Sequence, residues 1–222
     1  AHKLEMDPLA LRLQNYTETD QKKDLPYSSP AGLRTSYDRV TAAFGWQDYR
    51  KPQPNGSKRR GVGLAAHEWG GGGNPPAYAW VKINGDGSAD VITGSQDIGT
   101  GSRTGLALVA AEELSLTVDQ VAVYLGDTAA GPYAPTSAGS ATLPTVGPAV
   151  RAAAADAKRQ LLEAAAKVLE ADDPQTLMIE AGTIYKTRDR AVNVTVKEVA
   201  GRLAPHMILG HGVRGRNPDD VS

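Results

Sequence analysis

A glycine-rich turn at residues 94–104 is the strongest candidate for a binding site in this sequence. It reads GSQDIGTGSRT and combines three spaced glycines with Ser and Thr hydroxyls. It joins a predicted strand to a predicted helix. Glycines let the backbone approach a ligand closely, and the first N–H groups of a helix have no partner within the helix. The spacing leaves two interpretations open, an anion-binding turn and an ordinary turn with a helix cap.

The turn does not match the common nucleotide-binding motifs. No Gly-Lys-Ser/Thr follows it, as a P-loop requires. Thr104 stands where a dinucleotide fingerprint needs a third Gly or Ala. The anion interpretation therefore rests on the strand–turn–helix layout alone.

Two further loops have compositions that suit a ligand. Residues 135–142 read PTSAGSAT and lead into the longest predicted helix, so they repeat the layout of small residues before a helix N-terminus. Two such turns in one domain would be able to face each other and hold two parts of a long ligand. Residues 68–73 read EWGGGG, and four glycines allow close contact with a substrate or cofactor. An ordinary capped loop and a flexible surface loop are the alternatives.

Other chemistry finds little support in the residues. The four histidines are scattered, and no carboxylate or cysteine joins them in a metal-binding pattern. No nucleophile-elbow pattern supports a Ser–His–Asp triad. Glu68 and Asp127 are conceivable acids for a hydrolase, but nothing in the sequence positions them. We therefore predict no metal site formed by side chains and no complete set of catalytic residues.

The composition excludes several classes of protein. The 222 residues include 24 Lys and Arg against 25 Asp and Glu, a formal net charge of −1. This balance gives no basic surface for nucleic acid or a charged membrane. The absence of cysteine excludes disulfides, iron–sulfur ligation and thiol catalysis within the chain. No apolar run approaches the roughly 20 residues of a membrane span.

The elements that must position these loops follow from hydrophobic periodicity and turn residues. We expect helices at 1–16, 30–44, 104–114, from the 135–142 loop to about residue 171, and 195–203. We expect strands at 62–68, 77–83, 89–93, 121–125, 177–180, 183–186 and 206–209. This order predicts an α/β or α+β fold, a mixed sheet packed by helices after a helical N-terminal lead-in. The Pro-, Gly- and Lys/Arg-rich stretch 47–60 divides a lead-in, 1–58, from a domain, 59–222. The chain opens at Ala1 without an initiator Met and ends in a polar loop, so we expect a piece of a longer protein.

Several segments resemble, in order, the molybdenum-binding large subunit of the xanthine dehydrogenase and aldehyde oxidase family. The resemblance is greatest to bacterial multi-subunit members of the aldehyde-oxidoreductase kind. Each segment is weakly diagnostic, but together they run over nearly the whole chain. The segments are MDPLALRLQNY at 6–16, SSPAGLR at 28–34, FGW at 44–46, RGVGLA at 60–65, NGDGS at 84–88, QDIGTGSRTGLALVAAEELS at 96–115, GDT at 126–128 and GS at 139–140.

The resemblance implies a set of cofactor-binding residues. In the family the first turn wraps the pterin dithiolene, which carries over to Gln96, Asp97, Ile98, Gly99, Thr100 and Gly101. The Gly-Ser element binds pterin and phosphate, which carries over to Gly139, Ser140, Ala141 and Thr142. Trp69 and Gly70 match a region near the substrate channel. The family often has Gln where this chain has the shorter Thr100.

The resemblance also implies the wider enzyme. The expected function is the molybdenum-cofactor-binding part of an oxidoreductase that hydroxylates an aldehyde or an N-heterocycle. The cofactor would be molybdopterin, in the cytosine dinucleotide form, unless this piece binds none by itself. Iron–sulfur clusters and FAD would lie on other parts or subunits. The partners would be the rest of the large subunit and the iron–sulfur and flavin subunits, in the bacterial cytoplasm or periplasm.

The family's catalytic Glu lies downstream in a Gly-x-Gly-Glu context that this chain does not contain. We therefore expect no catalytic residue here and no activity of the 222-residue chain alone. The alternative is a non-catalytic domain that binds a phosphate-bearing ligand or a partner subunit through its Gly/Ser loops.

Overall fold

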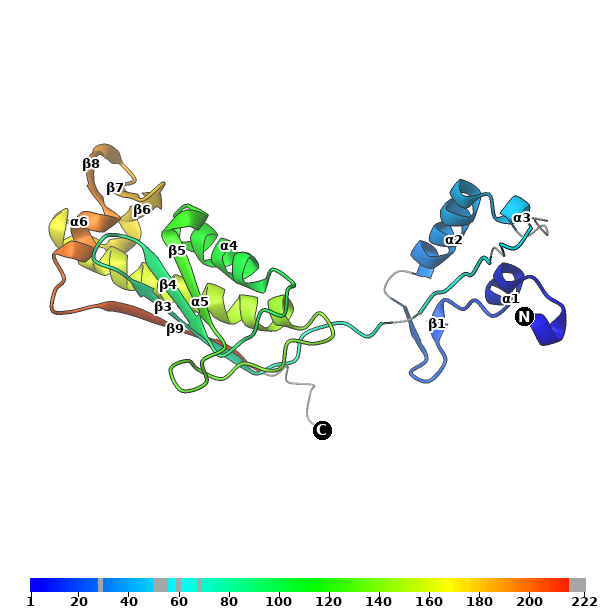
Figure 1. Cartoon of the computed structure of the whole chain (residues 1–222). Helices are drawn as coiled ribbons and strands as arrows, with labels where there is room; N and C mark the ends of the chain where they lie inside the picture. Colours follow the sequence, from blue (N-terminus) through cyan, green and yellow to red (C-terminus); the bar gives the residue numbers. More distant parts are fainter. Residues whose placement is uncertain (28–29, 50–55, 59–60, 68, 216–222) are drawn as a thin grey trace. The chain divides into compact units, whose positions relative to one another are not determined.

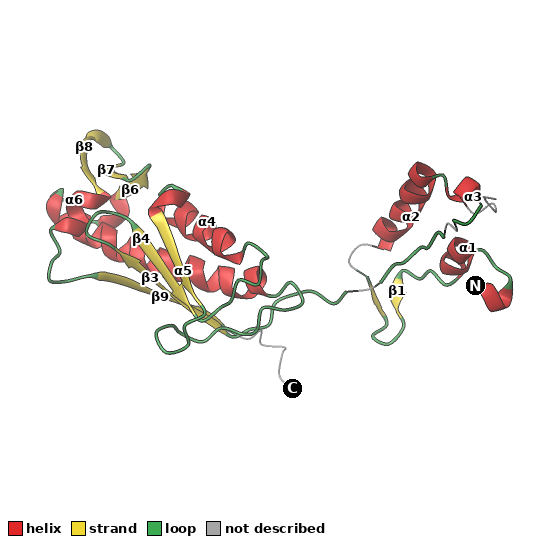
Figure 2. Ribbon diagram, viewed as in Figure 1, coloured by secondary structure: helices red, strands yellow, loops and turns green. Residues whose placement is uncertain are grey.

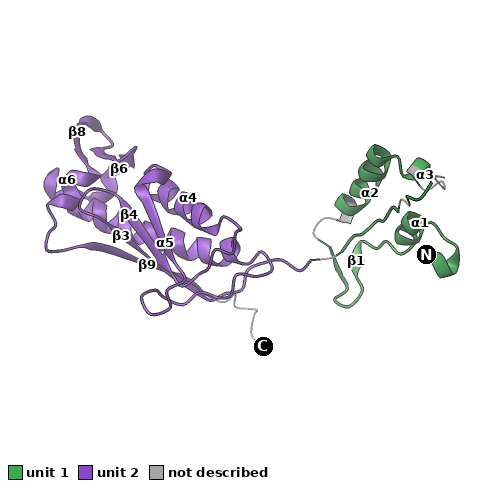
Figure 3. Ribbon diagram, in the orientation of Figure 1, with its two compact units in different colours: residues 1–68 green, residues 69–222 purple. Residues whose placement is uncertain are grey.

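The chain forms two compact units, Ala1–Glu68 and Trp69–Ser222 (Figure 1, Figure 3). The structure, a computed structural model, describes residues 1–27, 30–49, 56–58, 61–67 and 69–215. Residues 61–67 belong to the first unit by their contacts. The boundary at 58/59, which was drawn from composition, stays a prediction.

The first unit consists of short helices and a small hairpin. Its elements are η1 (His2–Leu4), α1 (Pro8–Gln14), β1 (Thr19–Asp20), β2 (Leu25–Pro26), α2 (Pro30–Phe44) and α3 (Trp46–Tyr49). Asp7 caps α1 by accepting a hydrogen bond from Ala10 N at 2.9 Å, and its other oxygen accepts one from Trp46 Nε1 at 3.2 Å. A single carboxylate thus starts one helix and ties it to another.

The second unit contains two sheets and the longer helices. Its elements are β3 (Ala77–Ile83), β4 (Ala89–Thr93), α4 (Ser102–Leu114), η2 (Val118–Gln120), β5 (Val121–Leu125), α5 (Thr142–Val168), η3 (Pro174–Thr176), β6 (Leu177–Glu180), β7 (Thr183–Lys186), β8 (Asp189–Thr195), α6 (Val196–Gly201) and β9 (Ile208–Arg214). The larger sheet has the order β5-β4-β3-β9, and the smaller one the order β6-β7-β8. The predicted α/β fold with a mixed sheet is confirmed, because β4 and β5 pair in parallel while the other pairs are antiparallel.

Helices α4 and α5 cover one face of the larger sheet (Figure 2). The sheet residues on that face are small and apolar, and they alternate with the exposed face along β3, β4 and β5. In α5 the predicted helical period is confirmed, since Val150, Ala153, Ala157, Leu161 and Ala165 are all buried. Alanine keeps the helix close to the sheet.

The contact between α5 and β9 depends on two glycines. A Cβ built at Gly210 would overlap the carbonyl oxygen of Ala153, and one at Gly212 would overlap that of Ala149. The helix backbone therefore lies directly against the strand backbone. No side chain larger than hydrogen fits at either position without moving α5.

Side chains occupy both edges of the larger sheet. At the β9 edge, Gln160 Nε2 donates to Leu209 O at 2.9 Å, and Asp156 Oδ2 accepts from His211 N at 3.1 Å. At the β5 edge, Arg103 Nη1 donates to Val123 O. Free strand edges attract further strands, so these side chains block sheet extension at the positions they occupy.

Replacement of Asp156 by Ala is expected to destabilise the second unit by about 1–3 kcal/mol, because a strand N–H loses a charged acceptor. Partial burial raises the pKa of Asp156, but hydrogen bonds from Arg159, His211 N and Gln160 outweigh it and leave the pKa below 3.8. The contribution is therefore present above that value and lost as the pH falls through the folded-state pKa. Urea unfolding and amide exchange at His211 measure it. Glu163→Ala is the matched control, since Glu163 pairs with the same Arg159 at 2.7 Å and, among the described residues, accepts no hydrogen bond from a strand. Equal losses in both variants would contradict the edge role.

Five predicted strands are confirmed at their predicted bounds, namely β3, β4, β5, β6 and β7. The predicted helix at 1–16 is divided, because Glu5 adopts a left-handed conformation with φ 48° and α1 begins only after Asp7. The predicted strand at 62–68 is wrong for 62–67, which form no strand; Glu68 lies outside the described residues. In the larger sheet β3 pairs with β4 on one side and with β9 on the other, so no further strand can pair with β3.

Several elements differ from expectation: α4 begins at Ser102 instead of residue 104, α6 runs over Val196–Gly201 instead of 195–203, and α3, β1 and β2 were not predicted. The last strand runs over Ile208–Arg214 instead of 206–209, since Gly210 and Gly212 hide its alternation. Strand β8 was not predicted, and its burial pattern is almost wholly exposed. The long helix α5 ends at Val168, with Leu169 as its C-cap, whereas the predicted end was near residue 171.

Candidate functional site

The two predicted ligand loops follow neighbouring parallel strands. The turn at 94–101 follows β4, and the loop at 126–141 follows β5. Because parallel strands have their carboxyl ends at the same edge of a sheet, both loops begin side by side. The sequence left it open whether the two loops face each other, and the parallel pairing of β4 and β5 brings them together.

Gln96 and Ser137 join the loops directly. Ser137 N donates to Gln96 Oε1 at 3.0 Å, and Ser137 Oγ donates to Gln96 O at 2.7 Å. Thr142 Oγ1 donates in turn to Ser137 Oγ at 2.8 Å, which connects the first residue of α5. Gly94 N donates to Pro132 O at 2.8 Å, and a Cβ at Gly94 would lie 2.6 Å from that oxygen. The glycine is required by this close approach.

The third predicted segment, which contains the four glycines, lies against the second loop. Gly72 N donates to Gly139 O at 3.2 Å, and Asn74 N donates to Thr145 Oγ1 at 2.6 Å. A Cβ at Gly139 would lie 3.2 Å from Gly70 O. Three loops from distant parts of the sequence therefore meet around the N-terminus of α5.

The N-terminus of α4 is occupied by a side chain of the turn itself. Asp97 Oδ1 accepts hydrogen bonds from the N–H groups of Gly99, Thr100 and Gly101 at 3.0–3.3 Å, and Oδ2 accepts one from Arg103 N at 3.0 Å. These hydrogen bonds, of which the one from Arg103 N has the largest effect, hold the pKa of Asp97 below its ordinary value of 3.8. Of the two interpretations left open for this turn, the structure shows the capped one at Arg103 N, where the chain supplies its own carboxylate.

The N-terminus of α5 is different. Its N-cap is Ala141, and no side-chain cap occurs there among the described residues. Gly139 and Ser140 precede it, both in the left-handed region with φ 58°, and Ser140 is exposed. Of the two predicted anion positions, this one is free of a capping side chain.

The outer side of the 94–101 turn is open. Gly99 and Gly101 have φ values of 96° and 76°, and a Cβ at either would meet nothing within 4 Å. Ile98 stands 67% exposed between these glycines and Asp97, and Trp69 is also largely exposed in the neighbouring segment. The turn thus presents bare backbone and an apolar side chain on the side away from the sheet.

The remaining candidates are structural or lie outside this region. Asp127 accepts hydrogen bonds from Ala129 N and Ala130 N at 2.9 and 3.1 Å, so its carboxylate shapes a loop. Glu68 lies outside the described residues. Within the described residues, no group of three or more His, Asp or Glu side chains is placed to hold a metal ion. Those same residues include no helix both long and apolar enough to span a membrane.

Two residues of the turn at 94–104 and one residue of α5 have roles that the sequence did not indicate. Ser95 is fully buried, and its Oγ is without a hydrogen-bond partner among the described residues. Arg103 fixes the N-terminus of α4 to β5, and Thr145 anchors the glycine-rich segment. Arg103 lies in the turn at 94–104 and Thr145 in the long helix, but no local signal indicates their roles, because each acts on a partner at least 20 residues away in the chain.

Gln96→Ala is expected to loosen the junction of the two loops and to cost about 1–2 kcal/mol, since its amide bonds both Ser137 N and Gly94 O. Faster amide exchange in residues 131–138, with helix α4 unchanged, is the measurable result. Gln175→Ala removes an exposed glutamine of η3 and serves as the control. Unchanged exchange in the Gln96 variant would show that the bond does not hold the loops together.

Comparison with known proteins places this geometry in a family. The family model described as molybdopterin cofactor-binding domain matches residues 39–214. A nicotinate dehydrogenase subunit of Pseudomonas putida is 43% identical over 105 residues, which are 47% of this chain and 9% of that protein. The xanthine dehydrogenase molybdenum-binding subunit of Escherichia coli is 28% identical over 208 residues, which are 89% of this chain and 27% of that protein.

A solved structure gives the same fold. The aldehyde oxidoreductase from Desulfovibrio desulfuricans aligns with a TM-score of 0.62 at 24% identity, over 96% of this chain and 22% of that one. The chain thus spans about a quarter or less of the length of these proteins. The resemblance that residues 6–140 carried is confirmed, and the chain belongs to the molybdopterin cofactor-binding domain family.

Proposed function

We propose that this chain is the cofactor-holding part of the large subunit of an oxidoreductase that hydroxylates an aldehyde or an N-heterocycle. The observation that carries the proposal is the junction of Gln96 with Ser137, in a chain of the molybdopterin cofactor-binding domain family. It joins two loops whose exposed backbone and hydroxyl groups can both reach one long ligand.

The residues present fit such a ligand, and they divide its recognition. The bare backbone at Gly99 and Gly101 would allow the close approach of a pterin ring system, since no Cβ stands between that backbone and a ligand. The uncapped N-terminus of α5 with the Ser140 hydroxyl suits a phosphate. At the N-terminus of α4 the Asp97 carboxylate would repel a phosphate, so we assign no anion to that end.

In this arrangement the ten predicted residues keep distinct roles. Asp97 holds the shape of the turn, and Gln96 fixes its distance from the second loop. Ile98, Gly99, Thr100 and Gly101 face the ligand, as do Gly139 and Ser140, while the buried Ala141 and the Ser137-bonded Thr142 would contribute only the backbone N–H groups at the start of α5. Trp69 and Gly70 would border the substrate side, since Gly70 lies beside Gly139.

The bound cofactor would supply the redox chemistry, while this chain orients it and shields it from solvent. We assign no catalytic residue to residues 1–222. The rest of the large subunit and the iron–sulfur and flavin subunits would be the partners.

Molybdenum and pterin analysis of the purified complete large subunit tests the proposal. One molybdenum and one pterin per subunit are expected, with the cytosine nucleotide released by acid hydrolysis. Absence of both from a subunit assembled in a molybdenum-replete host would overturn the assignment and favour a domain for another phosphate-bearing ligand.

A further inference from the structure

The face of the larger sheet opposite α4 and α5 carries ordered rows of side chains. The strand register places Tyr124, Ile92, Trp80 and His211 side by side across all four strands. Tyr78 and Val213 form the row on one side, and Ala122, Asp90, Lys82 and Leu209 the row on the other. The rings of Trp80 and His211 meet edge to face at 6.3 Å between centroids.

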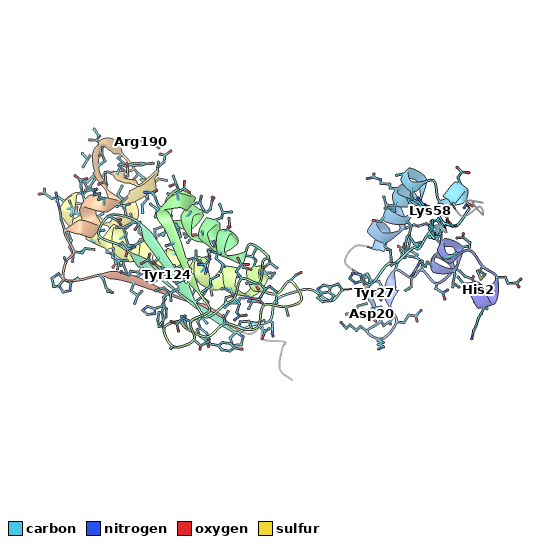
Figure 4. All side chains as sticks on the ribbon, viewed as in Figure 1. His2, Asp20, Tyr27, Lys58, Tyr124 and Arg190 are labelled. Carbon is cyan, nitrogen blue, oxygen red and sulfur yellow. The ribbon has the colours of Figure 1, made fainter. Side chains whose placement is uncertain are left out.

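This face is apolar at its centre and polar at its border. Tyr124, which Figure 4 labels, is 57% exposed although it stands in a regular strand. Val213 is 54% exposed in the regular strand β9. Lys82 and Asp90 pair at 3.9 Å, so that row carries no net charge. A hollow of about 460 Å³ opens beside Ile92 and Tyr124, and its lining also includes the charged residues Lys82, Asp90, Arg103 and Asp127. A central apolar row with charged groups beside it is the composition of a protein interface.

The sheet cannot readily add a strand instead. Arg103 occupies the β5 edge at Val123, and Gln160 with Asp156 occupies the β9 edge at Leu209 and His211. Any protein that covers the apolar rows must therefore pack face to face on them.

From these observations we infer that the Tyr124–Ile92–Trp80 face is the surface on which the remainder of the large subunit packs. The inference rests on the proposed function in one respect, because it requires the chain to be part of a longer large subunit. The chain spans 27% of the length of the Escherichia coli subunit, so a relative of that size has nearly three quarters of its residues available to cover the face. A tethered segment also binds at a higher effective concentration than a second copy. The covering segment must present apolar side chains to Ile92 and Tyr124, and polar groups to the charged residues that line the rest of the hollow.

Cysteine labelling can test this sharply, because the chain contains no cysteine of its own. Tyr124→Cys probes the face. Met178→Cys, 50% exposed on β6 of the other sheet, is the matched control. Each variant is reacted with a maleimide, as the 222-residue chain and within the complete large subunit, and labelling at the introduced cysteine is followed by peptide mass spectrometry.

We expect both cysteines to react at similar rates in the 222-residue chain, and Tyr124→Cys to react at least tenfold more slowly than Met178→Cys in the complete subunit. A smaller difference there would overturn the inference. Slow, concentration-dependent labelling of Tyr124→Cys in the 222-residue chain, with a dimer by light scattering, would assign the face to a second copy and would also overturn it. Val213→Cys replaces Tyr124→Cys if that variant does not fold. Protection in a subunit that lacks molybdenum and pterin would reject the proposed function and leave this inference standing.

Discussion

Gly212→Ala is expected to abolish the stable fold of the second unit, or to lower its unfolding free energy by about 3 kcal/mol or more. The added Cβ would overlap Ala149 O, and Ala153 N and Cβ lie beside it. Those atoms belong to α5, and a rotamer change cannot relieve the overlap because the nearest of them are backbone atoms. The helix must move away from β9 and would lose its closest contact with the sheet.

The measurement is thermal unfolding of the 222-residue chain, with a fall in Tm of about 6–12 °C for a loss of this size. Gly215→Ala is the matched control, because a Cβ there meets nothing within 4 Å and its φ lies outside the left-handed region. Gly210→Ala should behave like Gly212→Ala, since its Cβ would overlap Ala153 O. A Gly212 variant as stable as the Gly215 variant would refute the direct backbone contact between α5 and β9.

Asp97→Asn is expected to reduce the molybdenum and pterin content of the complete large subunit at least tenfold. An amide retains one oxygen for the N–H groups of Gly99, Thr100 and Gly101, but its NH₂ group would face Arg103 N, which needs an acceptor. The turn would then open at the start of α4, and the backbone at Gly99 and Gly101 would lose its fixed position.

The control is Asp127→Asn, which alters a carboxylate of similar role in the neighbouring loop without touching the turn. In the 222-residue chain, Asp97→Asn should also lower stability at neutral pH. Because the pKa of Asp97 is held below 3.8, the wild-type advantage is present above that pH and disappears as the pH falls through the folded-state pKa. Full cofactor content in the Asp97 variant would show that the carboxylate does not shape the binding turn.

Gly212→Ala and Asp97→Asn test different parts of the structure. Gly212 acts on the layer of sheet and helix that carries both loops, and Asp97 acts within one loop. Loss of cofactor in Asp97→Asn with little change in the amide exchange of β9 would separate the site from its scaffold.

Local patterns in the sequence determined most of the scaffold. Alternating apolar residues predicted β3 and β4 at their observed bounds, and the Gly-containing segment NGDGS between them forms the hairpin that Asn84 N closes on Ser88 O. The alanine-rich period of α5 predicted its buried face. These patterns predict the elements correctly because each depends only on residues that are close together in the sequence. The family resemblance is likewise a linear property of the sequence.

The tertiary structure decided what the loops offer a ligand. The residues alone gave the helix N-termini of α4 and α5 the same chemistry, but the fold turns Asp97 onto the first and leaves the second uncapped. Gln96 and Ser137 are 41 positions apart, and they meet because β4 and β5 are parallel neighbours. The predicted strand at 206–209 was too short for β9, because Gly210 and Gly212 interrupt the alternation of apolar and polar side chains. Glycine is required at these positions because the backbone of α5 packs directly on the strand. A sequence records which residues can bond or pack closely, while the pairing of distant strands determines which of those groups remain available to a cofactor.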